Sequence, residues 1–237
     1  GNRMVTSYSA EARALVLEGA GIEQVDAAVG RSGFGYGIGP FQMADIVGLA
    51  MFHRMRKSRG LDDRFRSLDD ALCEAGRHGQ QNGLGYYSYK DNPRVGKADP
   101  AVAALARDVA ASNGVRRRLQ ITEREIQDRL LLPLINEGFK ILEEGIASKA
   151  SDIDMIKING YSFPGAKGGP MQYAKEIGYA KVLVGLQRYP NTMGVTTGSK
   201  PWWRPSQLLV ECARTGVDPD VILARRDAIL RPPKANL

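Results

Sequence analysis

An internal repeat constrains this chain more than any other feature of its sequence. In each half, an arginine is followed at matching intervals by two glutamates, an aspartate and a Gly-Pro pair. The first copy consists of Arg3, Glu11, Glu18, Asp26 and Gly39-Pro40, and the second of Arg129, Glu137, Glu144, Asp154 and Gly169-Pro170. The early spacings agree residue for residue, and the later ones differ only by small insertions. The chain therefore contains two copies of one unit, and such an arrangement often replaces a symmetric dimer of the single unit.

Helical periodicity runs through both copies and predicts an all-α protein. Apolar residues recur at helical spacing, and Ser67 and Thr122 are good N-caps with an acidic residue three positions later. Only residues 79–89 alternate in the manner of an extended strand, and Pro133 is expected to interrupt its helix. The predicted helices cover residues 3–19, 22–29, 39–52, 67–72, 122–144, 151–158, 170–189, 206–215 and 218–230, with room for another over 101–111.

The repeat divides the chain into three parts. We assign residues 1–98 to the first repeat, 99–120 to a connecting segment and 121–237 to the second repeat. Proline and glycine residues weaken the periodic pattern between the copies, which favours a connection there. Each copy has an apolar helical face to bury, so we expect the two to pack together within one chain as a pseudo-dimer. The prediction is a monomer in solution.

Composition narrows the class of protein further. The chain has 237 residues, of which 43% are hydrophobic and 25% charged, as in soluble intracellular globular proteins. Two cysteines, Cys73 and Cys212, and two histidines, His53 and His78, are too few for a disulfide framework or a four-cysteine zinc site, and they leave little room for a histidine-built metal centre. We therefore predict no bound metal. No apolar run reaches the length of a membrane helix and no secretory leader opens the sequence, so membrane insertion is not expected.

The net charge of +7 is compatible with three kinds of anionic partner: nucleic acid, an anionic membrane surface or a polyphosphorylated ligand. The basic residues gather in two clusters, one over residues 54–66 and the other at Arg116, Arg117 and Arg118. No stacking aromatic residues are interleaved with them, as single-strand binding would require. Solvated helix ends explain such clusters more simply, because cations also suit the negative pole of a helix. We expect no nucleic-acid partner.

The residues themselves present no convincing catalytic centre. The glycine-rich run 33–39 follows no buried strand, so it fits a tight backbone turn leading into the Pro40 helix better than a dinucleotide site. His53 lies among basic residues and is expected on the surface, and His78 in its loop has no assigned role. The repeated glutamates fit helix caps or an interface between the repeats at least as well as acid–base chemistry.

Several motifs resemble the C-terminal region of the 3-hydroxyacyl-CoA dehydrogenase family. They are Gly1-Asn2-Arg3-Met4 through Ala20, residues 35–49, 79–87 and 136–148, Asp152-Ile153-Asp154, Asn159-Gly160-Tyr161 and Gly168-Gly169-Pro170-Met171. The likeness extends to about Gly216, and the doubled arrangement resembles the multifunctional branch, which joins enoyl-CoA hydratase and dehydrogenase activities in one polypeptide. Ala50 and Gly37 depart from the family pattern, at positions without known chemistry.

This resemblance implies the all-α fold of the 6-phosphogluconate dehydrogenase C-terminal-domain type. It also implies that the catalytic histidine and glutamate, together with the Rossmann domain that binds NAD, lie upstream and outside this chain. The expected function is a part of an NAD-dependent 3-hydroxyacyl-CoA dehydrogenase of fatty acid β-oxidation. Its partners would be the acyl-CoA substrate and the upstream Rossmann and hydratase domains. In this chain we expect no catalytic, cofactor-binding or metal-binding residue, and no activity of the chain alone. The alternative is a non-catalytic module that holds the hydratase and dehydrogenase parts together.

Asn2 is the one site residue that the resemblance supplies. It matches the family's asparagine at the start of the first helix, whose amide helps to position substrate beside the catalytic histidine. A neutral amide offers both a donor and an acceptor without imposing charge. The second repeat has Asp128 at the corresponding position. The alternative is an ordinary helix N-cap, and Arg3 is expected to be structural because Arg129 repeats it.

The final tripeptide, Ala235-Asn236-Leu237, resembles a degenerate Ser-Lys-Leu peroxisomal address, with Lys234 just before it. A peroxisomal location is therefore expected. The alternative is a cytoplasmic bacterial protein whose last leucine is there by chance.

Overall fold

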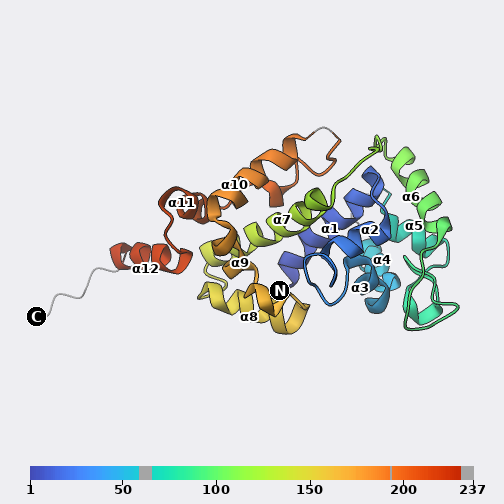
Figure 1. Ribbon diagram of the computed structural model, residues 1–237, viewed down its shortest axis with the longest axis horizontal. Helices are drawn as coiled ribbons and strands as arrows, with labels where there is room; N and C mark the ends of the chain where they lie inside the picture. Colours follow the sequence, from blue (N-terminus) through green and yellow to red (C-terminus); the bar gives the residue numbers. More distant parts are fainter. Residues whose placement is uncertain (59–65, 193, 231–237) are drawn as a thin grey trace, which may run out of the picture. The chain divides into compact units, whose positions relative to one another are not determined.

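The computed structural model describes residues 1–58, 66–192 and 194–230, and over these residues the protein is all-α, as predicted (Figure 1). The helices of the first half are α1 (Asn2–Glu18), α2 (Ile22–Val29), α3 (Pro40–Val47), α4 (Leu49–Ser58), α5 (Leu68–Glu74), the short 3-10 helix η1 (Gln80–Asn82) and α6 (Pro100–Ser112). Those of the second half are α7 (Glu123–Glu143), α8 (Ala150–Tyr161), η2 (Gly165–Lys167), α9 (Pro170–Ile177), α10 (Tyr179–Arg188), η3 (Tyr189–Asn191), η4 (Pro201–Trp203), α11 (Gln207–Thr215) and α12 (Pro219–Leu230). In this part of the chain, no helix is both long and apolar enough to cross a membrane.

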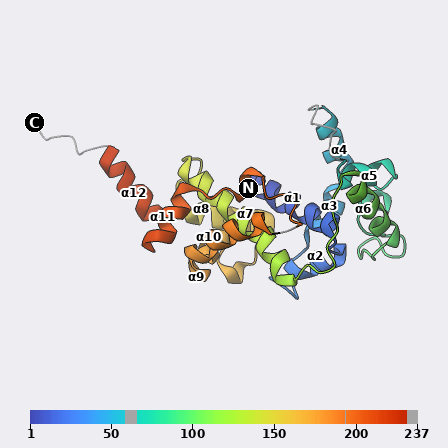
Figure 2. The same ribbon diagram turned by 90° about the horizontal axis from the view of Figure 1, so that it is seen from above.

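The chain forms two compact units whose boundaries differ from those of the repeats. Among the described residues, the C-terminal unit contains 1–8, 128–192 and 197–230, and the N-terminal unit contains 9–58, 66–127 and a short segment that ends at Thr196. The opening turns of α1 thus belong with the second repeat. Segment 99–120, which we expected to connect the copies, carries α6, and α6 packs against α5 within the N-terminal unit (Figure 2).

The repeat is visible in local structure as well as in sequence. In the first copy, Asp26 accepts hydrogen bonds from the Phe41 and Gln42 amides at 2.9 and 3.1 Å, at the beginning of α3. In the second copy, Asp154 accepts from the Met171 and Gln172 amides at 2.7 and 3.1 Å, at the beginning of α9. Each aspartate therefore caps the helix that follows the Gly-Pro pair of its own copy. The glycines Gly39 and Gly169 are required there, because a Cβ at either would overlap the capping carboxylate.

Two long helices expected from periodicity are each broken at one glycine. The predicted helix over 39–52 is two helices, α3 and α4, separated by Gly48 with φ of 93°. The helix predicted over 170–189 breaks in the same way at Gly178, with φ of 91°. These left-handed conformations cannot continue a right-handed helix, and glycine adopts them without steric penalty. The prediction of two continuous helices was wrong because the helical spacing of apolar residues continues across both glycines.

Pro133 does not interrupt its helix, contrary to prediction. α7 runs from Glu123 to Glu143 with Pro133 inside it. The residues around the proline are almost fully buried, namely Leu130, Leu131, Leu132, Leu134 and Ile135. Burying one such side chain stabilises a fold by about 1.5–3 kcal/mol, so several together offset the roughly 3 kcal/mol that a proline inside a helix costs.

The predicted N-caps are confirmed, whereas the predicted strand is not formed. Ser67 Oγ accepts from the Asp70 amide, and Thr122 Oγ1 accepts from the Glu125 amide at 3.1 Å. Over residues 79–97 the described backbone makes isolated bridges and no ladder. The buried carboxylate of Asp45 explains this, because it binds the amides of Tyr86 and Tyr87 at 2.8 and 3.0 Å and so uses donors that a sheet would need.

Candidate functional site

Asn2, the predicted substrate residue, is exposed at the first position of α1, within the C-terminal unit. Its side-chain oxygen Oδ1 accepts a hydrogen bond of 2.6 Å from the hydroxyl of Tyr161, which ends α8. Among the described residues, Oδ1 of Asn2 accepts its hydrogen bond from the Tyr161 hydroxyl and not from a backbone amide of α1. The geometry therefore differs from that of an N-cap, in which the side-chain oxygen accepts from the second or third helical amide.

Tyr161 is brought to Asn2 by the way α8 ends and by the residue that precedes Asn2. Ser162, directly after Tyr161, has φ of 56° and terminates the helix in a left-handed conformation. Gly1 lies against the phenol so closely that a Cβ at this position would overlap the ring. A glycine before Asn2 thus lets the Tyr161 hydroxyl reach the amide.

Lys157 lies one helical turn before Tyr161 and is the most unusual charged group of this region. Its side chain is only 2% exposed, and its Nζ lies 4.5 Å from the centre of the Tyr161 ring. Burial lowers the pKa of Lys157 from 10.5 to about 8. Its interaction with the electron-rich face of the phenol is a cation–π contact, which holds ring and ammonium together.

Arg3 has the structural role predicted for it. Its guanidinium pairs with Glu137, and with Glu144 at 2.7 Å, so a residue of the first repeat binds the repeated glutamates of the second. The expectation that these glutamates serve an interface between the repeats is confirmed for this pair. Arg3 thereby fixes the first turn of α1 and, with it, the backbone of Asn2.

The glycine run 33–39 leads into α3 as a tight turn, as expected. The amides at the start of α3 are already bound to Asp26, whose 5% exposure leaves no room for a second anion. A dinucleotide pyrophosphate needs free amides at a helix N-terminus. The turn before α3 therefore does not fit a dinucleotide site.

The prediction of a surface position for His53 is wrong. Its Nδ1 lies 2.8 Å from a carboxylate oxygen of Asp70, and the side chain is half-buried between α4 and α5. Sequence reasoning missed this because the partner lies on the next helix. His78 is also half-buried, and its backbone carbonyl accepts the Leu49 amide as α4 begins.

Three arginines of the basic clusters make contacts within the protein: Arg66, Arg117 and Arg118. Arg117 donates to the carbonyls of Val16 and Leu17 at the carboxyl end of α1, at 2.9 and 3.1 Å. Arg118 binds the Glu125 carboxylate with both terminal nitrogens. This agrees with the interpretation of the clusters as cations at helix ends. In the first cluster Arg66 pairs with Glu74, and residues 59–65 lie outside the described part of the chain.

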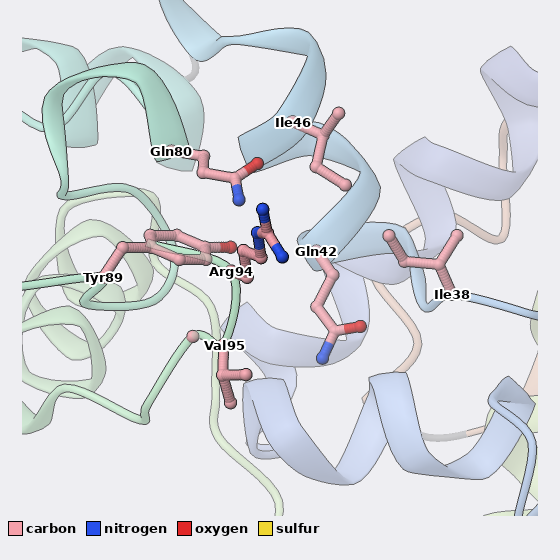
Figure 3. A pocket seen from close by; sticks show the side chains of 8 residues that line it. Ile38, Gln42, Ile46, Gln80, Tyr89, Arg94 and Val95 are labelled. Carbon is pink, nitrogen blue, oxygen red and sulfur yellow. The ribbon is translucent and has the colours of Figure 1, made fainter. Parts of the chain in front are cut away.

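A small pocket of ≈ 150 Å³ lies in the N-terminal unit (Figure 3). Its lining combines apolar residues with three long polar side chains, Gln42, Gln80 and Arg94. Ligand pockets usually have volumes of about 300–1,000 Å³, so this one is too small for an acyl-CoA. None of the sequence-predicted site residues lines it.

No group of three or more histidine, cysteine, aspartate or glutamate side chains in the described residues is arranged to hold a metal ion. Cys73 and Cys212 are buried free thiols, and burial raises the pKa of each, to about 11 and about 12. Thiols with raised pKa values are poor nucleophiles at neutral pH.

Comparison with known proteins relates the first part of the chain to a known domain family. Residues 1–89 match the 3-hydroxyacyl-CoA dehydrogenase C-terminal domain. This segment is a member of that domain family. The wider chain is 36% identical over 235 residues to the peroxisomal bifunctional enzyme of Danio rerio and 36% identical over 236 residues to that of Homo sapiens. Each alignment covers 92% of this chain and 32% of the relative, so the chain spans about a third of the length of these relatives.

A solved structure supports the same relationship. The dehydrogenase part of multifunctional enzyme 1 from C. elegans superposes with a TM-score of 0.69 at 26% identity, over 90% of this chain and 46% of that one. The resemblance to the C-terminal region of the multifunctional branch is thus confirmed. Tyr161 falls within a motif that carries this resemblance, and a polar side chain there could have been singled out from sequence. Lys157 gave no such signal, because a lone lysine in a helix is ordinary.

Proposed function

We propose that this chain is the helical, substrate-side part of an NAD-dependent 3-hydroxyacyl-CoA dehydrogenase of fatty acid β-oxidation, within a multifunctional enzyme that also has enoyl-CoA hydratase activity. The observation that carries the proposal is the 36% identity to peroxisomal bifunctional enzymes over 92% of the chain. The substrate would be a 3-hydroxyacyl-CoA and the product the corresponding 3-oxoacyl-CoA. The cofactor would be NAD, with no metal.

The reaction needs groups that we assign to other domains. Oxidation at C3 transfers a hydride from that carbon to the nicotinamide, while a base takes the proton of the hydroxyl. The described residues offer no free helix N-terminus in the glycine-rich turn, since Asp26 occupies the amides of α3. We therefore assign NAD binding, and the histidine and glutamate that act as base and orienter, to a Rossmann domain elsewhere in the enzyme.

Asn2 is the residue of this chain that we propose to contact substrate. It is exposed, and its backbone is fixed by the neighbouring ion pairs of Arg3. An amide donor aimed at a substrate oxygen would stabilise negative charge that develops on it. The role of this chain would be to orient the acyl-CoA, since ligand sites favour the interface between domains.

The experiment that tests this function compares the chain with and without a nucleotide-binding domain. The chain alone is expected to show no reduction of acetoacetyl-CoA by NADH, because we assign the base and the cofactor site to the Rossmann domain. Joining the nucleotide-binding domain of a relative to its N-terminus is expected to give turnover in the ordinary enzymatic range, on the order of 1–1000 per second. Turnover by the chain alone at such rates would contradict the proposal.

The second candidate function, from a different class, is a non-catalytic assembly module. It is favoured by the ion pairs through which Arg3 joins the two repeats within one chain. A chimera that folds and binds its cofactor, yet turns over no 3-oxoacyl-CoA, would support this candidate instead.

The chain is expected to be a monomer, because each repeat takes the place of a partner subunit. Light scattering of the purified chain should give a mass near 25.9 kDa. A stable dimer in which the first repeat of one chain pairs with the second repeat of another would contradict this prediction.

For location we propose the peroxisome, on the basis of the relatives named peroxisomal. The terminal tripeptide Ala235-Asn236-Leu237 lies outside the described residues. A fluorescent reporter fused to the last dozen residues is expected to be found in peroxisomes, and a diffuse cytosolic signal would count against this address.

A further inference from the structure

We infer that Tyr161 is a positioning residue of the substrate site, and that its hydroxyl orients the Asn2 amide so that the NH₂ group is presented to a substrate oxygen. This inference rests on the proposed function of Asn2, and it adds the chemical role of that amide. The two side chains come from helices α1 and α8, and the two residues are 159 positions apart in the sequence.

The direction of the hydrogen bond determines what Asn2 can offer. A side-chain amide has one oxygen that accepts and one nitrogen with two protons to donate. The Tyr161 hydroxyl donates to Oδ1 at 2.6 Å, so the oxygen is engaged and the nitrogen is left to donate. Asn2 would therefore offer its N–H pair to an acceptor, such as the carbonyl oxygen of a 3-oxoacyl thioester.

The second repeat provides a contrast within the same unit. Asp128 stands where the first repeat has Asn2, and it also accepts a hydrogen bond from a tyrosine, Tyr189, at 2.8 Å. An ionised aspartate has no proton to donate. A tyrosine hydroxyl thus donates to the side-chain oxygen at both Asn2 and Asp128. Of these two side chains, only that of Asn2 has N–H groups that could be donated to a ligand.

Tyr161 is itself held on several sides. Gly1 lies against the phenol where no side chain could fit, and Ser162 ends the helix immediately beyond it. Lys157 places a buried ammonium 4.5 Å from the ring centre, and no carboxylate pairs with that ammonium among the ion pairs of the described residues. Burial of an unpaired charge is unfavourable, so this lysine is not explained by stability. Its contact with the ring restricts the position of the phenol and thereby of the hydroxyl.

The first test removes only the hydroxyl. In the enzyme that includes the nucleotide-binding domain, Tyr161→Phe is expected to lower kcat about tenfold with little change in KM, which is the effect of one lost hydrogen bond that acts in the transition state. Tyr173→Phe is the matched control, because Tyr173 also has a lysine over its ring, Lys167 at 5.9 Å. The control should retain full turnover.

A double-mutant cycle separates action through Asn2 from independent action. If Tyr161 acts by orienting Asn2, the double variant Asn2→Ala/Tyr161→Phe will be no slower than Asn2→Ala alone. Losses that multiply, or a Tyr161→Phe enzyme with normal turnover, would overturn the inference.

NMR spectroscopy tests the orientation of the Asn2 amide without measuring enzymatic activity. In this chain, Tyr161→Phe should shift the ¹H–¹⁵N signals of the Asn2 side-chain amide, whereas Tyr173→Phe should leave them in place. Lys157→Met should also shift them and raise the melting temperature, since it removes the buried charge and frees the ring. Unchanged Asn2 signals in Tyr161→Phe would refute the orientation of the amide. Normal turnover of Asn2→Ala with shifted signals in Tyr161→Phe would instead refute the proposed function of Asn2.

Discussion

Replacing Asn2 with alanine is expected to lower the turnover of the complete enzyme about 100- to 1000-fold, the usual effect of removing one donor to developing negative charge. The melting temperature should stay within a few degrees of the original, because Asn2 is exposed and the first turn of α1 is fixed by the ion pairs of Arg3. Steady-state kinetics and a thermal melt on the same preparation measure both quantities.

The matched control for this variant is Asn191→Ala. Asn191 is also exposed in the C-terminal unit and also makes a helix-end contact, from its Nδ2 to the Gln187 carbonyl at 2.8 Å. It should show normal turnover. If Asn2→Ala lost stability while turnover remained normal, Asn2 would have only a structural role through its bond to Tyr161, and the proposed substrate contact would be wrong.

Sequence predicted the helical architecture well because the signals involved are local. An N-cap such as Thr122 needs only a hydroxyl and the amide three residues later, and the structure forms that bond. The breaks at Gly48 and Gly178 were missed because a glycine inside an apolar pattern does not reveal the sign of its φ. At Pro133 a break was predicted but the helix continues. Burial of the neighbouring side chains outweighs the missing hydrogen bond, and local sequence does not reveal that burial.

The candidate site was predictable only in part. Asn2 was proposed from the resemblance, but its partner Tyr161 lies on another helix. No spacing rule connects residues at that separation. The same limit explains the error at His53, whose position depends on Asp70 of the next helix. Sequence periodicity describes which face of a helix is buried, and it says little about which side chain from elsewhere will meet it.

Replacing Asp26 with alanine is expected to lower the free energy of unfolding by about 3 kcal/mol, the largest stability effect that we predict. Asp26 is 5% exposed and accepts three hydrogen bonds, from the Phe41 and Gln42 amides and from the Tyr87 hydroxyl at 2.8 Å. Each of these bonds contributes about 1 kcal/mol net to the free energy of unfolding, and alanine would leave all three donors without that partner. Urea unfolding measures the change.

Alanine variants of two further aspartates provide smaller expected losses of unfolding free energy for comparison with Asp26→Ala. Asp154→Ala should cost about 2 kcal/mol, because the repeat-equivalent aspartate accepts only the two backbone amides at the start of α9. Asp152→Ala should cost about 1 kcal/mol or less, since Asp152 is an exposed residue that bonds the single amide of Lys149. Equal losses for all three would contradict the claim that burial and the number of donors set the order.

The pH dependence gives an independent check on Asp26. Burial raises its pKa from 3.8 to about 6, although the hydrogen bonds to Phe41, Tyr87 and Gln42 oppose the rise. The folded chain then holds a proton between pH 4 and 6 that the unfolded chain releases, so stability from this group is greatest below pH 4 and falls as the pH rises through 6. Asp26→Asn cannot titrate and should lack this fall. Relative to the original chain, its free energy of unfolding should therefore rise by about 2 kcal/mol between pH 4 and 7, and a constant difference across that range would show that the pKa of Asp26 is not raised.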